Sequence, residues 1–212
     1  MYNNINRYYQ KMKIFSIMFM HYVSTMQVPI MLYNYHNIEN VSIFNRNSAK
    51  EIYIFIGREI TKRACADESQ CIHYNEYICC YKITPKNLAI VVLTDEEYPK
   101  RVSFDFIEKA LKIFVTKIPE KEWIYDMKDK PINIPEITNL LSEYQNPTNV
   151  DKISKIKNEL NEVKEIIIKS LDQLLERGQK LDDVIEKSQD LSFKSKIFLK
   201  RSKDLNKCCT VL

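Results

Sequence analysis

The chain has 212 residues, a hydrophobic content of 45% and a formal net charge of +4. This length accommodates one domain with a sizeable core and an extension, and the hydrophobic content excludes a wholly disordered chain. The net charge is mild and does not by itself indicate a nucleic-acid-binding protein, for which a strong basic stripe would be expected.

The first 38 residues contain a stretch that could be confused with a membrane span. We assign residues 1–11 to an N-terminal extension, and residues 14–38 contain no Asp, Glu, Lys or Arg. A signal peptide or a span would share that feature, but a span needs about 20 predominantly apolar residues, and polar side chains and Pro29 interrupt this one. Two strands, over 13–19 and 28–33, are therefore favoured.

The next elements predict a mixed domain. A helix is expected from Asn47 or Ser48 to about Arg63, with Glu51 completing a capping box. Two or three strands follow over 71–83 and 87–94, and the wholly apolar run 88–93 should be a central strand. A helix opening at Pro99 and a short helix over 136–144 complete the order. We therefore predict an α+β fold in which helices cover the faces of an antiparallel sheet.

The six cysteines show no zinc-ligand spacing. The pairs at 65 and 71 and at 79 and 80 have the wrong separations, and no histidine is suitably placed. We expect reduced, mostly buried thiols and no metal site.

Residues 144–150 form a linker, and 151–205 carry an apolar repeat of seven residues over two turns. This pattern predicts a long coiled-coil helix. Its sixteen seam positions are Ile153, Ile156, Leu160, Val163, Ile167, Ser170, Leu174, Arg177, Leu181, Val184, Ser188, Leu191, Ser195, Phe198, Ser202 and Leu205.

Arg177 is the large charged residue in the middle of this seam. A guanidinium is always charged and carries five donors, so burying it among leucines alone costs several kcal/mol. It fits a seam if partner helices supply acceptors, such as glutamine carbonyls, at that layer. The alternative is an arginine that extends to solvent from an ordinary coiled coil.

The C-terminal tail, residues 206–212, predicts lipid attachment. Cys209-Thr-Val-Leu212 fits a prenylation box, and Cys208 beside it is a natural palmitoylation site. Two lipids anchor stably where one is marginal, and basic residues upstream, such as Lys203 and Lys207, add attraction to anionic lipid. The alternative is a chance pair of cysteines in a frayed tail.

These features together resemble a known family. The segment 174–183, Leu-Leu-Glu-Arg-Gly-Gln-Lys-Leu-Asp-Asp, is similar to the centre of R-SNAREs, which are synaptobrevin-like v-SNAREs. The cysteine pair narrows this to the prenylated longin R-SNAREs of YKT-six type. The stretches 95–102 and 144–147 also resemble that family, and the likeness covers residues 12–212.

The resemblance implies a profilin-like longin domain over 12–143 and a SNARE motif over 151–205. Arg177 would be the ionic layer facing glutamines of three Q-SNARE helices, flanked by Leu160, Ile167, Leu174, Leu181, Val184, Leu191 and Phe198. It also implies a closed form restrained by the longin domain, with Ile43 or Phe44 as the surface hydrophobic contact. The protein would occupy the cytosol and the cytoplasmic face of ER, Golgi and vesicle membranes, with prenyl on Cys209, palmitoyl on Cys208 and no other cofactor.

Two other functions remain as alternatives. A lipid-anchored adaptor or tether would use the longin domain for partners and the helix as a passive stalk. An enzyme finds no support, because the histidines have no paired nucleophile or carboxylate in a motif. Apolar residues outside the seam, including Leu171, Ile185 and Leu199, should either cover the longin domain or widen the bundle interface.

Overall fold

A six-stranded sheet forms the centre of the molecule. The computed structural model describes residues 13–39, 41–75, 77–147, 150, 168–175 and 178–208. The strands are β1 (Ile14–His21), β2 (Ile30–His36), β3 (Ser69–Tyr74), β4 (Tyr77–Ile83), β5 (Leu88–Asp95) and β6 (Ile168–Ser170). Their order is β2-β1-β5-β4-β3-β6, and every neighbouring pair is antiparallel except β3 and β6.

The strand predictions are largely confirmed. Residues 14–38 form the β1–β2 hairpin, and no described helix has the length and apolar content needed to cross a membrane. The apolar strand β5 lies between β1 and β4 and is buried from Leu88 to Thr94. Of the two or three strands expected over 71–94, the structure has three: the chain reverses after Tyr74, where Asn75 takes a φ of 52°, and residues 69–74 and 77–83 pair as β3 and β4. Asparagine tolerates this left-handed conformation better than most residues.

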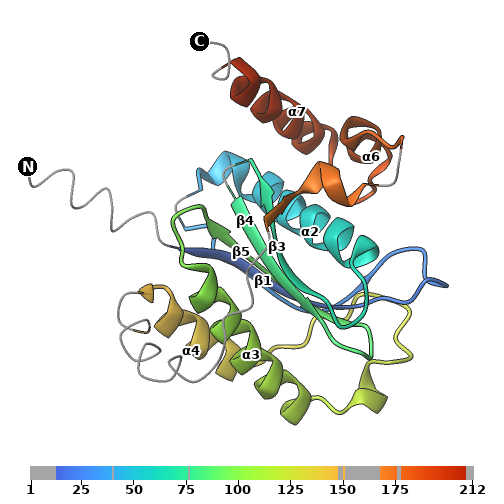
Figure 1. Ribbon diagram of the computed structural model, residues 1–212, viewed down its shortest axis with the longest axis vertical. Helices are drawn as coiled ribbons and strands as arrows, with labels where there is room; N and C mark the ends of the chain where they lie inside the picture. Colours follow the sequence, from blue (N-terminus) through green and yellow to red (C-terminus); the bar gives the residue numbers. More distant parts are fainter. Residues whose placement is uncertain are drawn as a thin grey trace, which may run out of the picture.

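Helices cover both faces of the sheet, as predicted (Figure 1). On one face lie α3 (Lys100–Lys117) and α4 (Pro135–Tyr144), and on the other lies α2 (Arg46–Arg63). Short 3-10 helices, η1 (Ile43–Asn45) and η2 (Glu120–Glu122), precede α2 and follow α3. Gly57 brings α2 close to β1, because a Cβ there would lie 2.6 Å from Cε of Met18.

The core has two parts, one on each face of the sheet. On the α3 and α4 face, Phe19 stacks on Phe114 at a centroid distance of 4.5 Å, and the hydroxyl of Tyr98 donates to the carbonyl of Tyr144 at 2.8 Å. On the α2 face, Phe55 and its apolar neighbours pack under residues from the end of the chain. This second part therefore depends on a distant segment.

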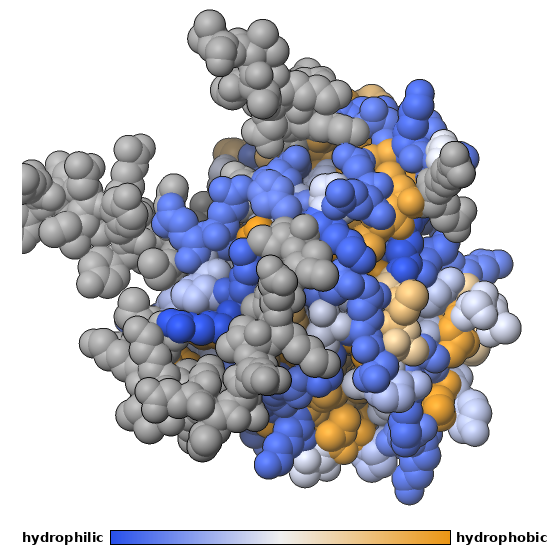
Figure 2. Space-filling view, viewed as in Figure 1, coloured by the Kyte–Doolittle hydropathy of each residue, from blue (hydrophilic) through white to orange (hydrophobic). Residues whose placement is uncertain are grey.

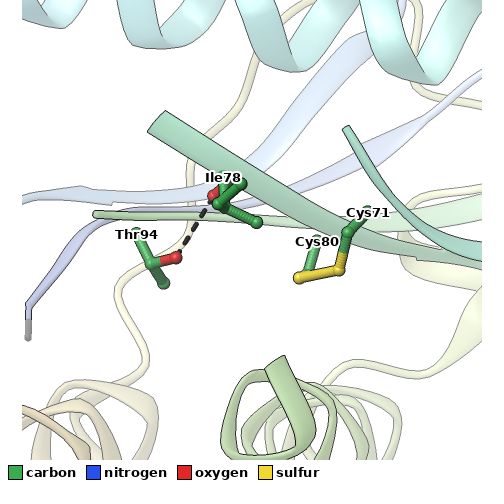
Figure 3. Close-up of a disulfide and its surroundings, with 4 residues drawn as sticks. All are labelled: Cys71, Ile78, Cys80 and Thr94. Carbon is green, nitrogen blue, oxygen red and sulfur yellow. Dashed lines mark hydrogen bonds between the residues drawn. A yellow bond between two sulfur atoms is a disulfide. The ribbon is translucent and has the colours of Figure 1, made fainter. Parts of the chain in front are cut away.

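The prediction of reduced cysteines is wrong for one pair. Cys71 on β3 faces Cys80 on β4 in register, and the two form a disulfide on the side of the sheet toward α3 (Figure 3). The hydroxyl of Thr94 donates to the carbonyl of Ile78 close by. Sequence spacing could not reveal this pairing, because the turn between the two strands was not predicted. Cys79 is free and buried, and Cys65 is free and exposed.

The end of the chain differs most from expectation. Residues 168–208, here called the C-terminal segment, form β6, η3 (Leu171–Leu174), α6 (Leu181–Lys187) and α7 (Phe193–Cys208) instead of one helix. Ser170 caps η3 through a reciprocal capping box with Gln173, and Gly178 has a φ of 88°. Packing on the domain outweighs the seven-residue repeat, since a helix is stabilised mainly by the surface its apolar face covers.

Candidate functional site

The outer side of α2 and the edge of β3 together hold the C-terminal segment. Its α6 and α7 lie beyond α2, on the opposite side of the sheet from α3 and α4 (Figure 1). Strand β6 extends the sheet at β3, with Cys71 opposite Ile168 and His73 opposite Ser170. Such strand addition satisfies backbone groups of β3 that an open sheet edge would leave unpaired.

Apolar burial holds this arrangement together. Leu171, Leu181, Ile185, Leu191 and Leu199 are all at most 5% exposed and belong to the core cluster that contains Phe55 of α2. Full burial of one such side chain stabilises by about 1.5–3 kcal/mol relative to exposure. The segment therefore shares the apolar core on this face.

Several of the predicted seam residues take part in this packing. Leu181, Val184 and Leu191 are 3%, 8% and 5% exposed, and Leu174 is partly buried against the same cluster. Phe198 differs, since it is 51% exposed while Leu199 beside it is buried. The buried face of the segment therefore combines seam positions with positions outside the seam. This agrees with the expectation that apolar residues outside the seam cover the longin domain.

Arg58 of α2 forms two ion pairs at the edge of the contact between the domain and the C-terminal segment, here called the Arg58 clamp. Its guanidinium pairs with Asp190 in the loop before α7 and with Asp129 in the loop before α4. Asp129 also accepts a hydrogen bond from the amide of Met31 at 2.8 Å. Burial raises the pKa of Asp190 and outweighs the opposing effect of Arg58, while the neighbouring Asp129 charge raises it further. One arginine thus joins the C-terminal segment to two parts of the domain.

Glu51 caps the start of α7 from the neighbouring helix. Its carboxylate accepts from the amide of Ser192 at 2.9 Å and from the hydroxyl of Ser195 at 2.7 Å. The capping box expected for α2 is therefore wrong: Asn45 precedes that helix without a side-chain cap, and Glu51 serves α7. Burial raises the pKa of Glu51, but these hydrogen bonds outweigh it and leave the pKa below its usual value.

Further polar contacts follow the same boundary. Arg63 of α2 donates to the side-chain oxygen of Gln179 at 3.1 Å, and Lys169 lies 3.9 Å from Glu68. Sequence reasoning missed the roles of Arg58 and Arg63, because charged residues on an amphipathic helix are ordinarily solvent-facing. It assigned Glu51 to a cap on its own helix. The contacts of these three residues can be identified only when the position of the C-terminal segment is known.

The remaining predicted site residues either lie at or outside the limits of the described part of the chain or are exposed where it is described. Arg177, Leu160, Ile167 and Cys209 lie outside the described residues, and Cys208 is the last residue of α7. Ile43 and Phe44 are 72% and 83% exposed, so their side chains do not form the apolar contact with the C-terminal segment. The carbonyl of Phe44 does accept a hydrogen bond from Lys194.

Two domain families match the chain in separate regions. The longin family of regulated-SNARE-like domains matches residues 38–141, and the synaptobrevin family matches residues 152–210. The first region contains the sheet from β3 to β5 with α2 and α3, and the second contains the C-terminal segment. A synaptobrevin-type region implies SNARE partners.

Curated relatives cover most of the chain. A putative synaptobrevin homolog YKT6 of Dictyostelium discoideum is 36% identical over 183 residues, which are 85% of this chain and 91% of that protein. The VAMP-like protein YKT61 of Arabidopsis thaliana is 33% identical over 201 residues, 95% of this chain and 100% of that protein. The synaptobrevin homolog YKT6 of Debaryomyces hansenii is 31% identical over 177 residues, 83% and 88% of the two chains. The chain therefore belongs to the YKT6-type longin R-SNAREs, which are SNARE proteins of vesicle trafficking.

Proposed function

We propose that this chain drives membrane fusion by assembling a four-helix bundle with three Q-SNARE helices. Arg177 would supply the ionic layer, and Leu160, Ile167, Leu174, Leu181, Val184, Leu191 and Phe198 the apolar layers. A buried arginine fixes register, because a shift by one heptad leaves its charge without acceptors.

We further propose that the packing of the C-terminal segment on α2 and β3 inhibits this assembly. The observation that carries the proposal is the burial of Leu181, Val184 and Leu191 at 8% exposure or less. A bundle needs the same side chains at its centre, so the two arrangements exclude each other. The broken elements of the C-terminal segment support this, because a bundle helix must be continuous through residues that here form β6 and turns.

The lipids complete the proposed mechanism. Prenylation of Cys209 and palmitoylation of Cys208 would hold the end of α7 at the cytoplasmic face of ER, Golgi and vesicle membranes. Each buried lipid methylene contributes about 0.8 kcal/mol, so two chains anchor stably while one binds reversibly. Replacement of Cys209 by Ser should abolish stable, salt-resistant attachment to membranes.

A direct test of the bundle uses candidate sets of glutamine-bearing SNARE helices. We expect the chain to form a thermally stable, SDS-resistant complex with at least one set. Arg177→Leu should weaken the discrimination between sets, while Arg201→Leu, outside the seam, should leave it intact. Absence of a stable complex with every set would contradict the proposal and favour an adaptor that uses the longin domain alone.

A further inference from the structure

Four of the large apolar side chains that the described surface exposes lie on two neighbouring elements. Ile43 and Phe44 on η1 are 72% and 83% exposed, and Phe193 and Phe198 on α7 are 80% and 51% exposed. The Lys194 ammonium donates to the carbonyl of Phe44, which joins the two elements across 150 positions of sequence. Lys194 follows Phe193 directly and precedes Phe198 by one helical turn. We call these five residues the η1–α7 face.

The packing of α7 on the domain does not require these aromatic side chains. The inward side of α7 is formed by Ser195 and Leu199, which are 0% and 2% exposed. In the space-filling view the described surface is mainly hydrophilic, with hydrophobic residues in small separate patches (Figure 2). Apolar side chains that gather at one junction of such a surface mark an interaction site more often than single ones do.

The charge around this face favours an anionic ligand. The sequence of α7 contains six Lys or Arg residues and one Asp, a net charge of +5. Lys200 pairs with the carboxylate of Glu186 on α6, whereas Lys194 and Lys196 donate to backbone carbonyls, those of Phe44 and Glu186. Lys194 therefore keeps a net positive charge beside Phe44. Exposed aromatic residues among lysines are typical of helices that lie in the interface of an anionic membrane.

We propose that the closed chain binds the surface of an anionic bilayer through the η1–α7 face. The position of α7 supports a membrane as the occupant, since this helix ends at Cys208, next to the cysteine proposed to carry the prenyl group. The inference rests on the proposed membrane role but does not require lipidation or bundle assembly. The side chains of Ile43, Phe44 and Phe193 would enter the headgroup region while Lys194 meets lipid phosphates or carboxylates.

This face exists only while α7 packs on the longin domain, because η1 belongs to that domain and α7 to the C-terminal segment. A ligand that binds one arrangement better than another shifts the equilibrium toward it. Anionic membrane would therefore stabilise the closed chain, and the same protein would be held closed on a membrane until SNARE partners compete for the segment.

The test uses the full chain carrying Cys208→Ser and Cys209→Ser, so that no lipid contributes to binding. Co-sedimentation is measured with vesicles of phosphatidylcholine alone and of phosphatidylcholine with phosphatidylserine. We expect binding to the mixed vesicles that falls as salt rises, and little binding to phosphatidylcholine alone. Adding Ile43→Ser and Phe44→Ser should lower the partition coefficient by at least about tenfold.

The chain offers a matched control. Tyr125 and Met127 are 83% and 72% exposed and lie in the loop before α4, outside the η1–α7 face. Their replacement by Ser removes similar apolar area and should change the partition coefficient less than about twofold. Phe193→Ser provides a second variant within the face, and circular dichroism of every variant checks the fold.

Three results would overturn the proposal: no binding to mixed vesicles, equal binding to both vesicle types, or equal loss in the two double variants. The outcome is separable from the proposed fusion function. Ile43→Ser with Phe44→Ser leaves the SNARE motif unchanged, so bundle assembly should persist whether or not vesicle binding is lost.

Discussion

The two faces of the sheet are covered in different ways. On one face, α3 and α4 close a core built within residues 14–150, including the stacked rings of Phe19 and Phe114. On the other face, α2 closes only part of the core, and the C-terminal segment covers the rest. Under the proposed function, the first covering stays in place, whereas the second must also be available to a bundle.

The contacts between the α2 face and the C-terminal segment are of a kind that allows the segment to dissociate. The added strand β6 has three residues, against six to eight for the other strands. Polar contacts at Arg58, Glu51 and Arg63 lie around the apolar centre, where they select the correct docked arrangement more than they add to its stability. We therefore expect damage at the first face to unfold the domain and damage at the second face to release the segment.

The largest effect is expected from Phe114→Ala. This ring is fully buried and stacked, so its loss should cost about 3–5 kcal/mol of unfolding free energy in urea titrations. Val115→Ala, next to it and 50% exposed, should cost less than about 1 kcal/mol. Release of the C-terminal segment without loss of domain stability in Phe114→Ala would contradict the division between the faces.

Ile185→Ala should act on the second face alone. Ile185 on α6 is fully buried and lies outside the seam, so its truncation should cost about 2–5 kcal/mol of docking free energy and leave the bundle layers unchanged. Hydrogen exchange should accelerate within 168–208 and stay slow in β1 and β5, and bundle assembly should be faster.

Phe193→Ala is the control for that experiment, since Phe193 is also outside the seam but is 80% exposed. It should leave both exchange and assembly rates near those of the parent. If Ile185→Ala instead lowered the stability of the whole domain by the same amount, the C-terminal segment would be a permanent part of the core.

Asp190→Asn and Asp129→Asn should have opposite effects on docking. Loss of the Asp190 charge removes the pair with Arg58 across the boundary, at a cost near 1 kcal/mol because burial already disfavours that charge. Loss of the Asp129 charge leaves Asp190 as the one charged partner of Arg58 in this clamp, and it removes the repulsion between the two carboxylates. Exchange within 181–199 should quicken in the first variant and slow slightly in the second. Changes of the same sign in both would show that the clamp acts only within the domain.

The sequence predicted the elements far better than the arrangement of the last forty residues. The strands at 13–19 and 88–93 and the helix from Pro99 were confirmed because each has a local pattern that matches its environment. The hairpin turn at Asn75 and the Cys71–Cys80 pairing were missed, since both depend on which residues lie opposite each other. Local periodicity indicates which face of a strand is buried, but it does not identify the residue of another strand that lies opposite.

The same limit explains the C-terminal segment. Its seven-residue repeat describes the surface that a bundle would use, and the sequence also holds apolar residues, such as Ile185 and Leu199, that suit a second surface. Under the proposed function, one sequence encodes two packings, and a periodicity analysis finds the one with the longer repeat. The closing contacts of Glu51 were missed for a related reason, because its local capping pattern competes with a distant partner that binds it better.

The smallest expected effect is that of Glu51→Gln, which keeps the shape of the α7 cap and removes its charge. A carboxylate at a helix start contributes about 0.3–1 kcal/mol, and solvent around Glu51 places the cost in the lower part of that range. Because the pKa of the docked Glu51 lies below its usual value of 4.5, its contribution is present above pH 4.5 and is lost as pH falls through the docked pKa. Exchange rates within 193–200 should therefore differ between parent and Glu51→Gln at pH 7 and converge at acid pH.

Glu59→Gln, which breaks an ion pair with Arg63 inside α2, should follow the parent more closely. Parallel profiles of parent and Glu51→Gln from neutral to acid pH would mean that Glu51 holds α7 through neutral hydrogen bonds, and that the rim of the second face does not depend on this charge.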